Sequence, residues 1–245
     1  MHKFFCLSFN VLEDIISVDD QEQIHHMKDV LRLKPGEEVD LFDEKGNEYD
    51  CIVEKVSDKA ITFVIAHRHL APPKREGVGI TVACAIPKNV KMDDIVDKLT
   101  QLGVERIIPL ETRRVIVRLS ADKKKERLER WKKIALSATK QSKRNFVPVV
   151  EPIQSMEEAM SNLKNFDLKL IPTLGGERRA LKELELERKP QNVIVFIGPE
   201  GDFTDEEVEL AKKNGCIPVT LGNLVLRVDT AAIALASFFR LYGNN

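Results

Sequence analysis

The segment 196–215, FIGPEGDFTDEEVELAKKNG, places Glu200 between two glycines directly after an apolar run. A glycine-rich turn between a strand and a helix is a common phosphate site, because backbone N–H groups and the positive end of the helix face the anion. Here residues 200–209 carry six acidic side chains and no Lys or Arg, so a phosphate would be repelled. The pattern therefore predicts a ligand without a polyphosphate group.

Two further glycine-bearing loops follow apolar runs, PTLGG at 172–176 and LGNLVLR at 221–227. In a parallel α/β sheet, ligands bind where the carboxyl ends of strands meet. None of the three loops matches the GxGxxG dinucleotide motif or the P-loop motif, which disfavours dinucleotide and triphosphate sites. We expect the loops at 172–176, 198–202 and 221–227 to lie at one edge of a sheet.

A basic segment between residues 113 and 144 holds thirteen Lys and Arg residues and three acids, although the net charge of the whole chain is −1. Such an excess attracts polyanions and makes RNA a candidate partner. The ordinary alternative for a run such as DKKKERLERWKK is a solvated helix face. The residues that we expect to contact RNA are Arg113, Arg114, Lys123, Lys124, Lys125, Lys143 and Arg144.

The composition, with 43% hydrophobic and 31% charged residues in a chain of 245, is that of an ordinary water-soluble protein. No run of 18 apolar residues and no signal peptide is present, so we expect a cytoplasmic protein without a membrane partner. The four cysteines are scattered without a CxxC pair, which predicts buried apolar side chains. His67 and His69 would share one face of a strand, but two ligands are weak evidence, so we expect no metal.

The elements that position these loops fall into two parts. Residues 1–70 have short strand patterns, a hairpin signal at Gly46 and Asn47, and one short helix that ends before Pro35 and Gly36. We interpret them as a small β-barrel or sandwich. The proline-containing segment 70–77 is typical of a linker, and we place the domains at residues 1–72 and 73–245.

After the linker, strands and helices alternate, which predicts a parallel sheet covered on both faces. Gly103 is expected to end one helix, and a long basic helix covers about 122–143. A charged helical segment is expected around 177–188. Capping boxes are expected at Ser155 with Glu158 and at Thr204 with Glu207. The uncharged run 230–239 predicts a helix buried in the core or against a partner subunit.

The segments IGPEGDFTDEEVELA and LGNLVLRVDTAAIA together resemble the RsmE family, the uridine-N3 methyltransferases of 16S rRNA within the SPOUT superfamily. The resemblance extends through KMDDIVDKLTQLGVERIIPLETRR, RWKKIALSATKQSKRNFVP and HHMKDVLRLKPGE, so it covers nearly the whole chain. It implies a PUA-like RNA-binding β-barrel at 1–72. It also implies an α/β SPOUT domain at 73–245 with a C-terminal trefoil knot. By the same resemblance, the protein is a homodimer that uses S-adenosylmethionine on 16S rRNA or the small ribosomal subunit.

The resemblance also implies roles for individual residues. Arg227 would stabilise the negative charge that develops on the uracil oxygens when N3 loses its proton, and either Glu200 or Asp229 would accept that proton. Arg227 could instead be a structural partner of Asp229. The cofactor would contact three loops and the next helix, through Leu170, Pro172, Thr173, Gly198, Pro199, Glu200, Gly201, Leu221, Gly222, Leu224, Val225, Leu226, Thr230 and Ala231.

The chain departs from the family pattern at three positions. Asp202 stands where a second glycine is usual, Val228 replaces a hydroxyl residue, and Asp229 shortens a glutamate. The departures at Asp202 and Val228 leave open a non-catalytic RNA-binding or ribosome-assembly protein on the same fold. An α/β enzyme acting on a small nucleotide is the third hypothesis, and the missing phosphate motifs disfavour it.

Overall fold

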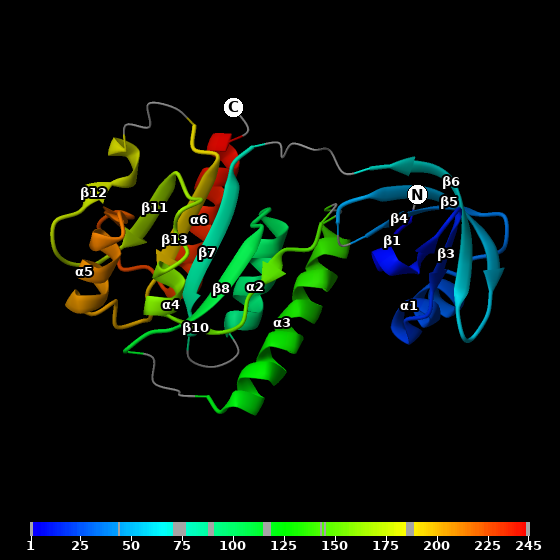
Figure 1. The fold of residues 1–245 in the computed structure, drawn as a ribbon, viewed down its shortest axis with the longest axis horizontal. Helices are drawn as coiled ribbons and strands as arrows, with labels where there is room; N and C mark the ends of the chain where they lie inside the picture. Colours follow the sequence, from blue (N-terminus) through cyan, green and yellow to red (C-terminus); the bar gives the residue numbers. More distant parts are fainter. Residues whose placement is uncertain are drawn as a thin grey trace. The chain divides into compact units, whose positions relative to one another are not determined.

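The computed structural model describes residues 2–43, 45–70, 77–87, 91–114, 119–142, 144, 146–184 and 189–243. The chain divides into two compact units (Figure 1). The N-terminal unit comprises Met1–Lys74 together with Thr139–Val147, and the C-terminal unit comprises Arg75–Ala138 and Pro148–Asn245. The expected linker is centred on residues 71–76, which lie outside the described residues.

The N-terminal unit is built on one six-stranded sheet. Its order is β1-β4-β5-β6-β3-β2, in which β1 is parallel to β4 and the other pairs are antiparallel. The strands are β1 (Lys3–Phe5), β2 (Val11–Leu12), β3 (Ile15–Val18), β4 (Glu38–Phe42), β5 (Glu48–Val56) and β6 (Ile61–His69). A short 3-10 helix, η1, covers Ser8–Asn10. The helix α1 (Gln21–His25) continues as the π-helical turn η2 (His26–Val30), and its Ile24 and Met27 pack into the core of this unit.

The predicted hairpin at Gly46 is confirmed as the β4–β5 connection, with Gly46 at a φ of 87°. The fully buried carboxylate of Asp43 organises the turn. It accepts hydrogen bonds from the backbone N–H groups of Lys45 and Asn47, from the Asn47 side chain and from the Tyr49 hydroxyl, all at 2.8 to 2.9 Å. Burial raises the pKa of Tyr49, and the hydrogen bond to Asp43 adds to the shift.

The C-terminal unit contains an eight-stranded sheet in which every pair is parallel. Its order is β10-β8-β7-β13-β11-β14-β12, and β9 also pairs with β8. The strands are β7 (Gly79–Ala85), β8 (Arg106–Glu111), β9 (Val149–Val150), β10 (Gln154–Ser155), β11 (Leu168–Pro172), β12 (Arg179–Ala180), β13 (Asn192–Ile197) and β14 (Ile217–Thr220). All residues of β7 are buried, as expected for a parallel strand covered on both faces.

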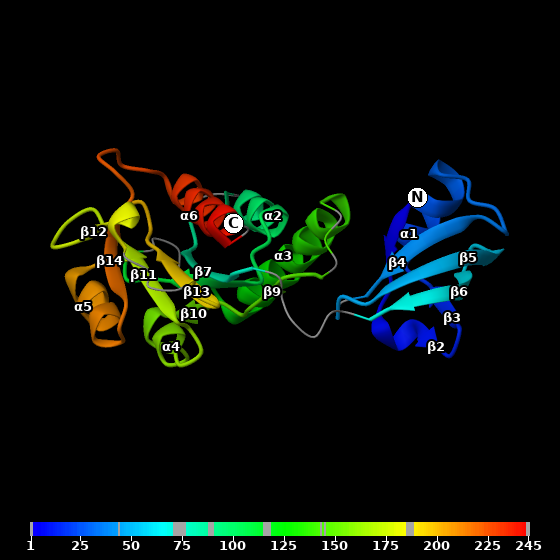
Figure 2. The same cartoon turned by 90° about the horizontal axis from the view of Figure 1, so that it is seen from above.

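Helices cover both faces of this sheet, as the alternating pattern predicts (Figure 2). The helices α2 (Lys91–Gln101) and α6 (Val228–Gly243) pack together, and α6 lies against β7 and β13. The helices α4 (Met156–Met160) and α5 (Asp205–Lys213) cover the opposite face. The long helix α3 (Ala121–Gln141) is joined to α2 by a hydrogen bond of 3.1 Å from Trp131 Nε1 to Asp93 Oδ1. No helix in the described part of the chain has the length and apolarity needed to cross a membrane.

The local signals for helix ends are confirmed. Ser155 with Glu158 and Thr204 with Glu207 form capping boxes, and Gly103 ends α2 at a φ of 85°. The helix predicted around 177–188 is wrong in its described part. Arg179–Ala180 form β12 on β14, followed by a 3-10 turn, η3, at Leu181–Glu183, because the unpaired edge of β14 offers hydrogen bonds that outweigh helix propensity. Residues 185–188 lie outside the described residues.

Candidate functional site

The three glycine-bearing loops follow the neighbouring strands β11, β13 and β14. Since these strands are parallel, their carboxyl ends lie at the same edge of the sheet, as expected from the sequence. The loop after β11 and the loop after β13 are also joined directly. The backbone N–H of Leu174 donates a 2.7 Å hydrogen bond to Asp202 Oδ2.

Threonine hydroxyls shape two of these loops in the same way. Thr173 Oγ1 donates to the Gly175 carbonyl and Thr220 Oγ1 donates to the Gly222 carbonyl, each at 3.0 Å. Gly176 and Gly222 have φ angles of 74° and 116°, which disfavour other residues. Short polar side chains and glycines therefore fix the backbone of both loops with little side-chain bulk at the sheet edge.

In the loop 198–203 the two glycines differ in how much space surrounds them. A Cβ on Gly198 would lie 3.0 Å from Cδ2 of the buried Phe203 ring, so this position has no room for a side chain. Gly201 is not in the left-handed region, and a Cβ there would meet only Arg114 Cδ, at 3.7 Å. The left-handed position is Asp202, with a φ of 61°. A glycine is thus required at 198 because a side chain would clash with Phe203, whereas the left-handed backbone conformation occurs at Asp202.

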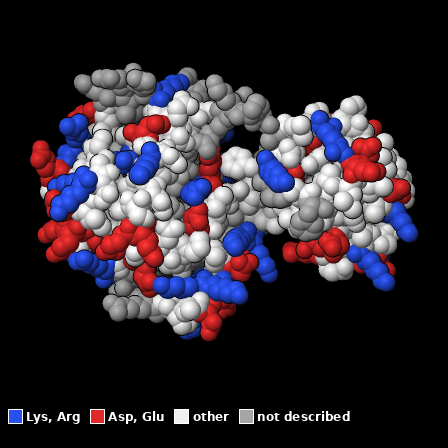
Figure 3. Space-filling model, in the orientation of Figure 1, with Lys and Arg blue, Asp and Glu red and all other residues white. Residues whose placement is uncertain are grey.

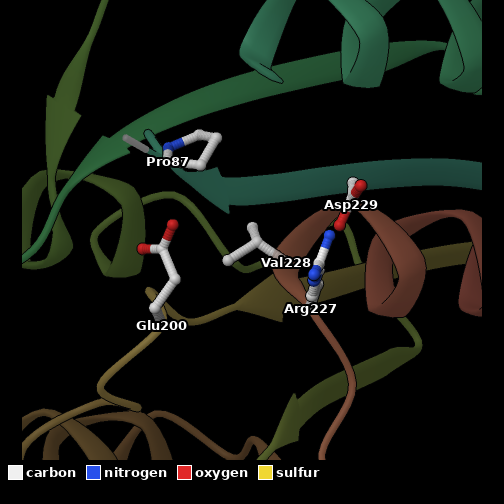
Figure 4. A pocket seen from close by; sticks show the side chains of 5 residues that line it. All are labelled: Pro87, Glu200, Arg227, Val228 and Asp229. Carbon is white, nitrogen blue, oxygen red and sulfur yellow. The ribbon is translucent and has the colours of Figure 1, made fainter. Parts of the chain in front are cut away.

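A cavity of about 230 Å³ lies where this loop faces the start of α6. It is lined by Pro87, which follows β7, by Glu200, and by Arg227, Val228 and Asp229. Figure 4 shows Glu200 approaching from one loop, and Arg227, Val228 and Asp229 from the first turn of α6 and the residue before it. Pro87 and Val228 are buried, whereas Glu200 and Arg227 are exposed. The structure thus brings the three candidate catalytic residues together beside a small apolar surface.

Asp229 carries the most unusual electrostatic feature of the cavity. Its Oδ1 atom is buried and has no hydrogen-bond partner, and among the described residues no ion pair joins Asp229 to Arg227. A buried carboxylate oxygen without a donor is costly, so this atom fits a ligand that brings a donor or a positive charge. The alternative that Arg227 is a structural partner of Asp229 therefore has no supporting contact.

A cysteine behind the cavity is chemically inert. Cys84, at the end of β7, is fully buried, and burial raises the pKa of its thiol to about 12, with the charges of Asp229 and Glu200 adding to the shift. All four cysteines are free and buried, as expected from their spacing. At neutral pH the Cys84 thiol is therefore protonated and is a poor nucleophile.

The residues predicted to hold a cofactor differ in exposure. Leu170 is completely buried within β11, and Thr173, Pro199 and Ala231 are also buried. Leu224 and Val225 are 79% and 73% exposed, which leaves apolar surface uncovered beside the site. Of the remaining residues, four are also exposed, Glu200, Gly201, Gly222 and Thr230. Four have intermediate exposure, Pro172, Gly198, Leu221 and Leu226. Direct ligand contact through the side chain of Leu170 is thus the least compatible with the structure.

Two of the residues predicted to contact RNA also make contacts that hold the site together. The Arg114 guanidinium donates to the carbonyls of Gly201 and Phe203, the second at 3.2 Å. The Arg113 backbone N–H donates a 2.9 Å hydrogen bond to the buried Glu207, and its side chain lies 3.7 Å from Glu206. These contacts span about ninety residues of sequence, so nothing in the local pattern could reveal them.

The other basic residues predicted to contact RNA differ in their exposure and in their contacts within the protein. Lys123 and Lys125 are exposed on the first turns of α3, whereas Lys124 forms an ion pair of 2.5 Å with Glu111. The Arg144 guanidinium stacks over the Phe146 ring at 4.3 Å, and Lys143 lies outside the described residues. On the face shown in Figure 3, Lys and Arg side chains are interspersed with Asp and Glu. The formal excess of positive charge is thus partly neutralised by neighbouring acids.

The two histidines expected on one strand face both approach Asp50. His69 Nε2 lies 2.9 Å and His67 Nδ1 lies 3.8 Å from Asp50 Oδ2, and the hydrogen bond raises the pKa of His69. Within the part of the chain that is described, no group of three or more His, Cys, Asp and Glu side chains is arranged to hold a metal ion.

Comparison with known proteins gives a consistent result along the chain. The model of an RNA methyltransferase domain matches residues 74–240, and that of an RNA methyltransferase PUA domain matches residues 18–66. The ribosomal RNA small subunit methyltransferase E of Bacillus subtilis is 31% identical over 219 residues, which cover 86% of this chain and 84% of that protein.

Solved structures extend the similarity to the fold. The ribosomal RNA small subunit methyltransferase E of Neisseria gonorrhoeae, bound to S-adenosyl methionine, aligns with a TM-score of 0.83 and 30% identity over 99% of this chain and 98% of that one. A Legionella pneumophila protein solved in complex with SAM aligns with a TM-score of 0.85 and 29% identity, over 98% and 97% of the two chains.

Proposed function

Since the chain belongs to the RNA methyltransferase family that contains ribosomal RNA small subunit methyltransferase E, we propose that it methylates 16S rRNA. The reaction transfers a methyl group from S-adenosylmethionine to N3 of a specific uridine, uracil 1498. The observation that carries this proposal is the cavity in which Arg227, Glu200 and the unpartnered Asp229 meet at the carboxyl edge of the sheet. Two proteins with the same fold were solved with this cofactor.

The residues present fit S-adenosylmethionine. Bound there, the cofactor supplies a methyl group activated by a sulfonium cation, and it contains no phosphate that the acidic loop would repel. The buried Oδ1 of Asp229 lacks a donor, which a cationic ligand can supply. The loops that begin at Thr173, Gly198 and Leu221 would hold the cofactor largely through backbone groups, because small residues let the backbone approach the ligand closely.

The chemistry required of the protein is charge stabilisation and proton removal. When N3 of uracil loses its proton, negative charge spreads onto the two ring carbonyl oxygens. Arg227 is exposed at the cavity and has no ion pair among the described residues, so its planar fork of donors is free to stabilise that charge. Glu200 and Asp229 are the two carboxylates that can take the proton.

The finer features of the fold are part of the same proposal. The strand β14 lies between β11 and β12, although β11 and β12 are consecutive in sequence. The chain then returns from β14 to α6, which packs against β7 and β13. This order supports a C-terminal trefoil knot, in which the last segment passes through the loop formed by the preceding one. The match of residues 18–66 supports a PUA-like β-barrel that binds RNA.

We propose that the protein works as a homodimer in the cytoplasm, on 16S rRNA or the small ribosomal subunit. Support for a dimer comes from α6, whose buried face leaves a second apolar stripe uncovered. Leu241 is 70% exposed, Ala234 is exposed, and Ile233 and Phe238 are only partly buried. Lys123 and Lys125 of α3 and, separately, the N-terminal unit are proposed to contact RNA. The proposal includes neither a metal ion nor a membrane.

The decisive test is nucleoside mass spectrometry of 16S rRNA and of small subunits that lack the modification, after incubation with protein and cofactor. We expect 3-methyluridine with the parent protein and very little with Arg227→Ala. Calorimetric titration with S-adenosylhomocysteine measures cofactor binding separately. Binding without any methylated uridine on either RNA substrate would contradict the enzymatic proposal, and absence of binding would contradict the cofactor assignment.

A further inference from the structure

Asp202 combines an unfavourable backbone conformation with two well-formed hydrogen bonds. Its φ of 61° is in the left-handed region, which glycine adopts freely and which most other residues avoid. Its Oδ1 accepts from the backbone N–H of Phe203 at 2.8 Å, and its Oδ2 accepts from the N–H of Leu174 at 2.7 Å. Asp tolerates this conformation better than most residues because its short side chain bonds to nearby backbone groups.

The second of these bonds joins two loops that follow different strands of the sheet, β11 and β13. The loop 173–178 is exposed from Leu174 to Arg178, and its other side-chain hydrogen bonds stay within the loop. Among the described residues, the bond from Leu174 to Asp202 is the one side-chain hydrogen bond between loops 173–178 and 198–203. Its loss would leave the loop 173–178 tethered mainly by its two ends.

The loop that carries Asp202 is itself anchored on its other side. Arg114, which lies beyond the end of β8, donates to the carbonyls of Gly201 and Phe203 that flank Asp202. Asp202 N–H also donates to the Pro199 carbonyl at 3.0 Å, which closes a turn around Glu200 and Gly201. Arg114 therefore holds loop 198–203 in place. Through its hydrogen bond to Leu174, Asp202 then restrains loop 173–178 against this anchored loop.

We propose that Asp202 is a positioning residue that holds loop 173–178 in the conformation that binds the cofactor. This inference rests on the proposed function, because it assigns both loops to the S-adenosylmethionine site. A ligand binds with its full affinity only to the fraction of molecules in which both loops are in place. By ordering loop 173–178 before the ligand arrives, the Asp202 carboxylate raises that fraction without touching the reacting atoms.

The test compares Asp202→Gly and Asp202→Asn with the parent. Glycine relieves the backbone strain and removes both acceptors, so the fold should persist while the Kd for S-adenosylhomocysteine rises about tenfold, as expected for loss of a charge-assisted hydrogen bond. Asparagine tolerates the left-handed conformation but keeps a single acceptor oxygen, so it should give a smaller rise. The KM for S-adenosylmethionine should rise with it, whereas kcat at saturating cofactor and the KM for RNA should stay near the parent values.

Hydrogen exchange at the Leu174 amide gives a readout that does not depend on activity. Exchange should be faster in Asp202→Gly than in the parent. Glu13→Gly is the matched control, because Glu13 also has a positive φ, of 48°, but lies in the N-terminal unit. It should leave both cofactor affinity and Leu174 exchange unchanged.

The outcomes separate this inference from the proposed function. Faster exchange at Leu174 with unchanged cofactor affinity would overturn the positioning role while leaving the methyltransferase proposal intact. A lower kcat with unchanged KM would also overturn it, because a positioning residue for the cofactor acts on binding. If the parent protein binds no S-adenosylhomocysteine, the proposed function itself fails, whatever the exchange rate at Leu174.

Discussion

Gly198 should be the most sensitive glycine of the acidic loop, and Gly201 should tolerate a methyl group. In Gly198→Ala the new Cβ would lie 3.0 Å and 3.1 Å from two carbons of the Phe203 ring and 3.3 Å from the Phe203 backbone nitrogen. The ring cannot move away easily, because Phe203 is 3% exposed and packs in the core with Phe196 and Ala211. In Gly201→Ala the new Cβ would lie 3.7 Å from its nearest neighbour, Cδ of the flexible Arg114 side chain.

The magnitude follows from the cost of overpacking a well-packed core, about 1 to 3 kcal/mol for an added methyl group. For a unit of this size each kcal/mol lowers the melting temperature by about 2 to 4 °C, so Gly198→Ala should melt several degrees lower. Displacement of the loop should also weaken binding of S-adenosylhomocysteine. Thermal melting and calorimetry on both variants check this. Equal melting temperatures for Gly198→Ala and the parent would refute the packing argument. A larger decrease in melting temperature for Gly201→Ala than for Gly198→Ala would also refute it.

Three further predictions concern catalysis, RNA binding and stability. Arg227→Ala should lower the single-turnover methylation rate by a factor of about 10² to 10³ and Arg227→Lys by a smaller factor, with cofactor affinity nearly unchanged in both. If Arg227→Ala methylates RNA as fast as the parent protein, the catalytic role is excluded. Replacing Lys123 and Lys125 together with Gln should reduce the slope of log affinity for RNA against log salt by about 0.7 to 0.9 per phosphate contact, and an unchanged slope would mean that this part of α3 faces solvent. Asp43→Ala should destabilise the N-terminal unit by on the order of 3 kcal/mol in denaturant unfolding, because several donors lose a buried acceptor; a loss below about 0.5 kcal/mol would contradict this.

The features that could be predicted from the sequence are those encoded by neighbouring residues. The capping box of Thr204 with Glu207 spans four residues, and the helix end at Gly103 depends on one residue. The parallel sheet follows from uniformly apolar strands that alternate with amphipathic helices. Because such signals are local, they also placed the three loops correctly after β11, β13 and β14 without any knowledge of the strand order.

The features that were missed depend on contacts between distant parts of the chain. Arg114 and Gly201 are 87 positions apart, so the hydrogen bond that anchors the loop has no local signature in the sequence. In the sequence Asp202 differs from its neighbours only as a departure from a family pattern, because its hydrogen bond to Leu174 spans 28 positions. The short strand at Arg179–Ala180 exists because β14 has a free edge, which strand order alone creates.

The six acids of the loop and helix at 200–209 are explained one at a time by their contacts. Glu207 and Asp202 accept backbone hydrogen bonds, and Glu206 and Glu209 lie in ion pairs with Arg113 and Lys212. Asp205 is exposed in the first turn of α5, where the positive end of the helix stabilises it. Glu200 is left without a hydrogen bond or ion pair among the described residues, and it lines the same cavity as the unpartnered Oδ1 of Asp229. The buried Oδ1 of Asp229 is tolerable if the bound ligand is cationic, which a sulfonium compound satisfies and a phosphate compound does not, whereas the exposed Glu200 carboxylate is hydrated without a ligand.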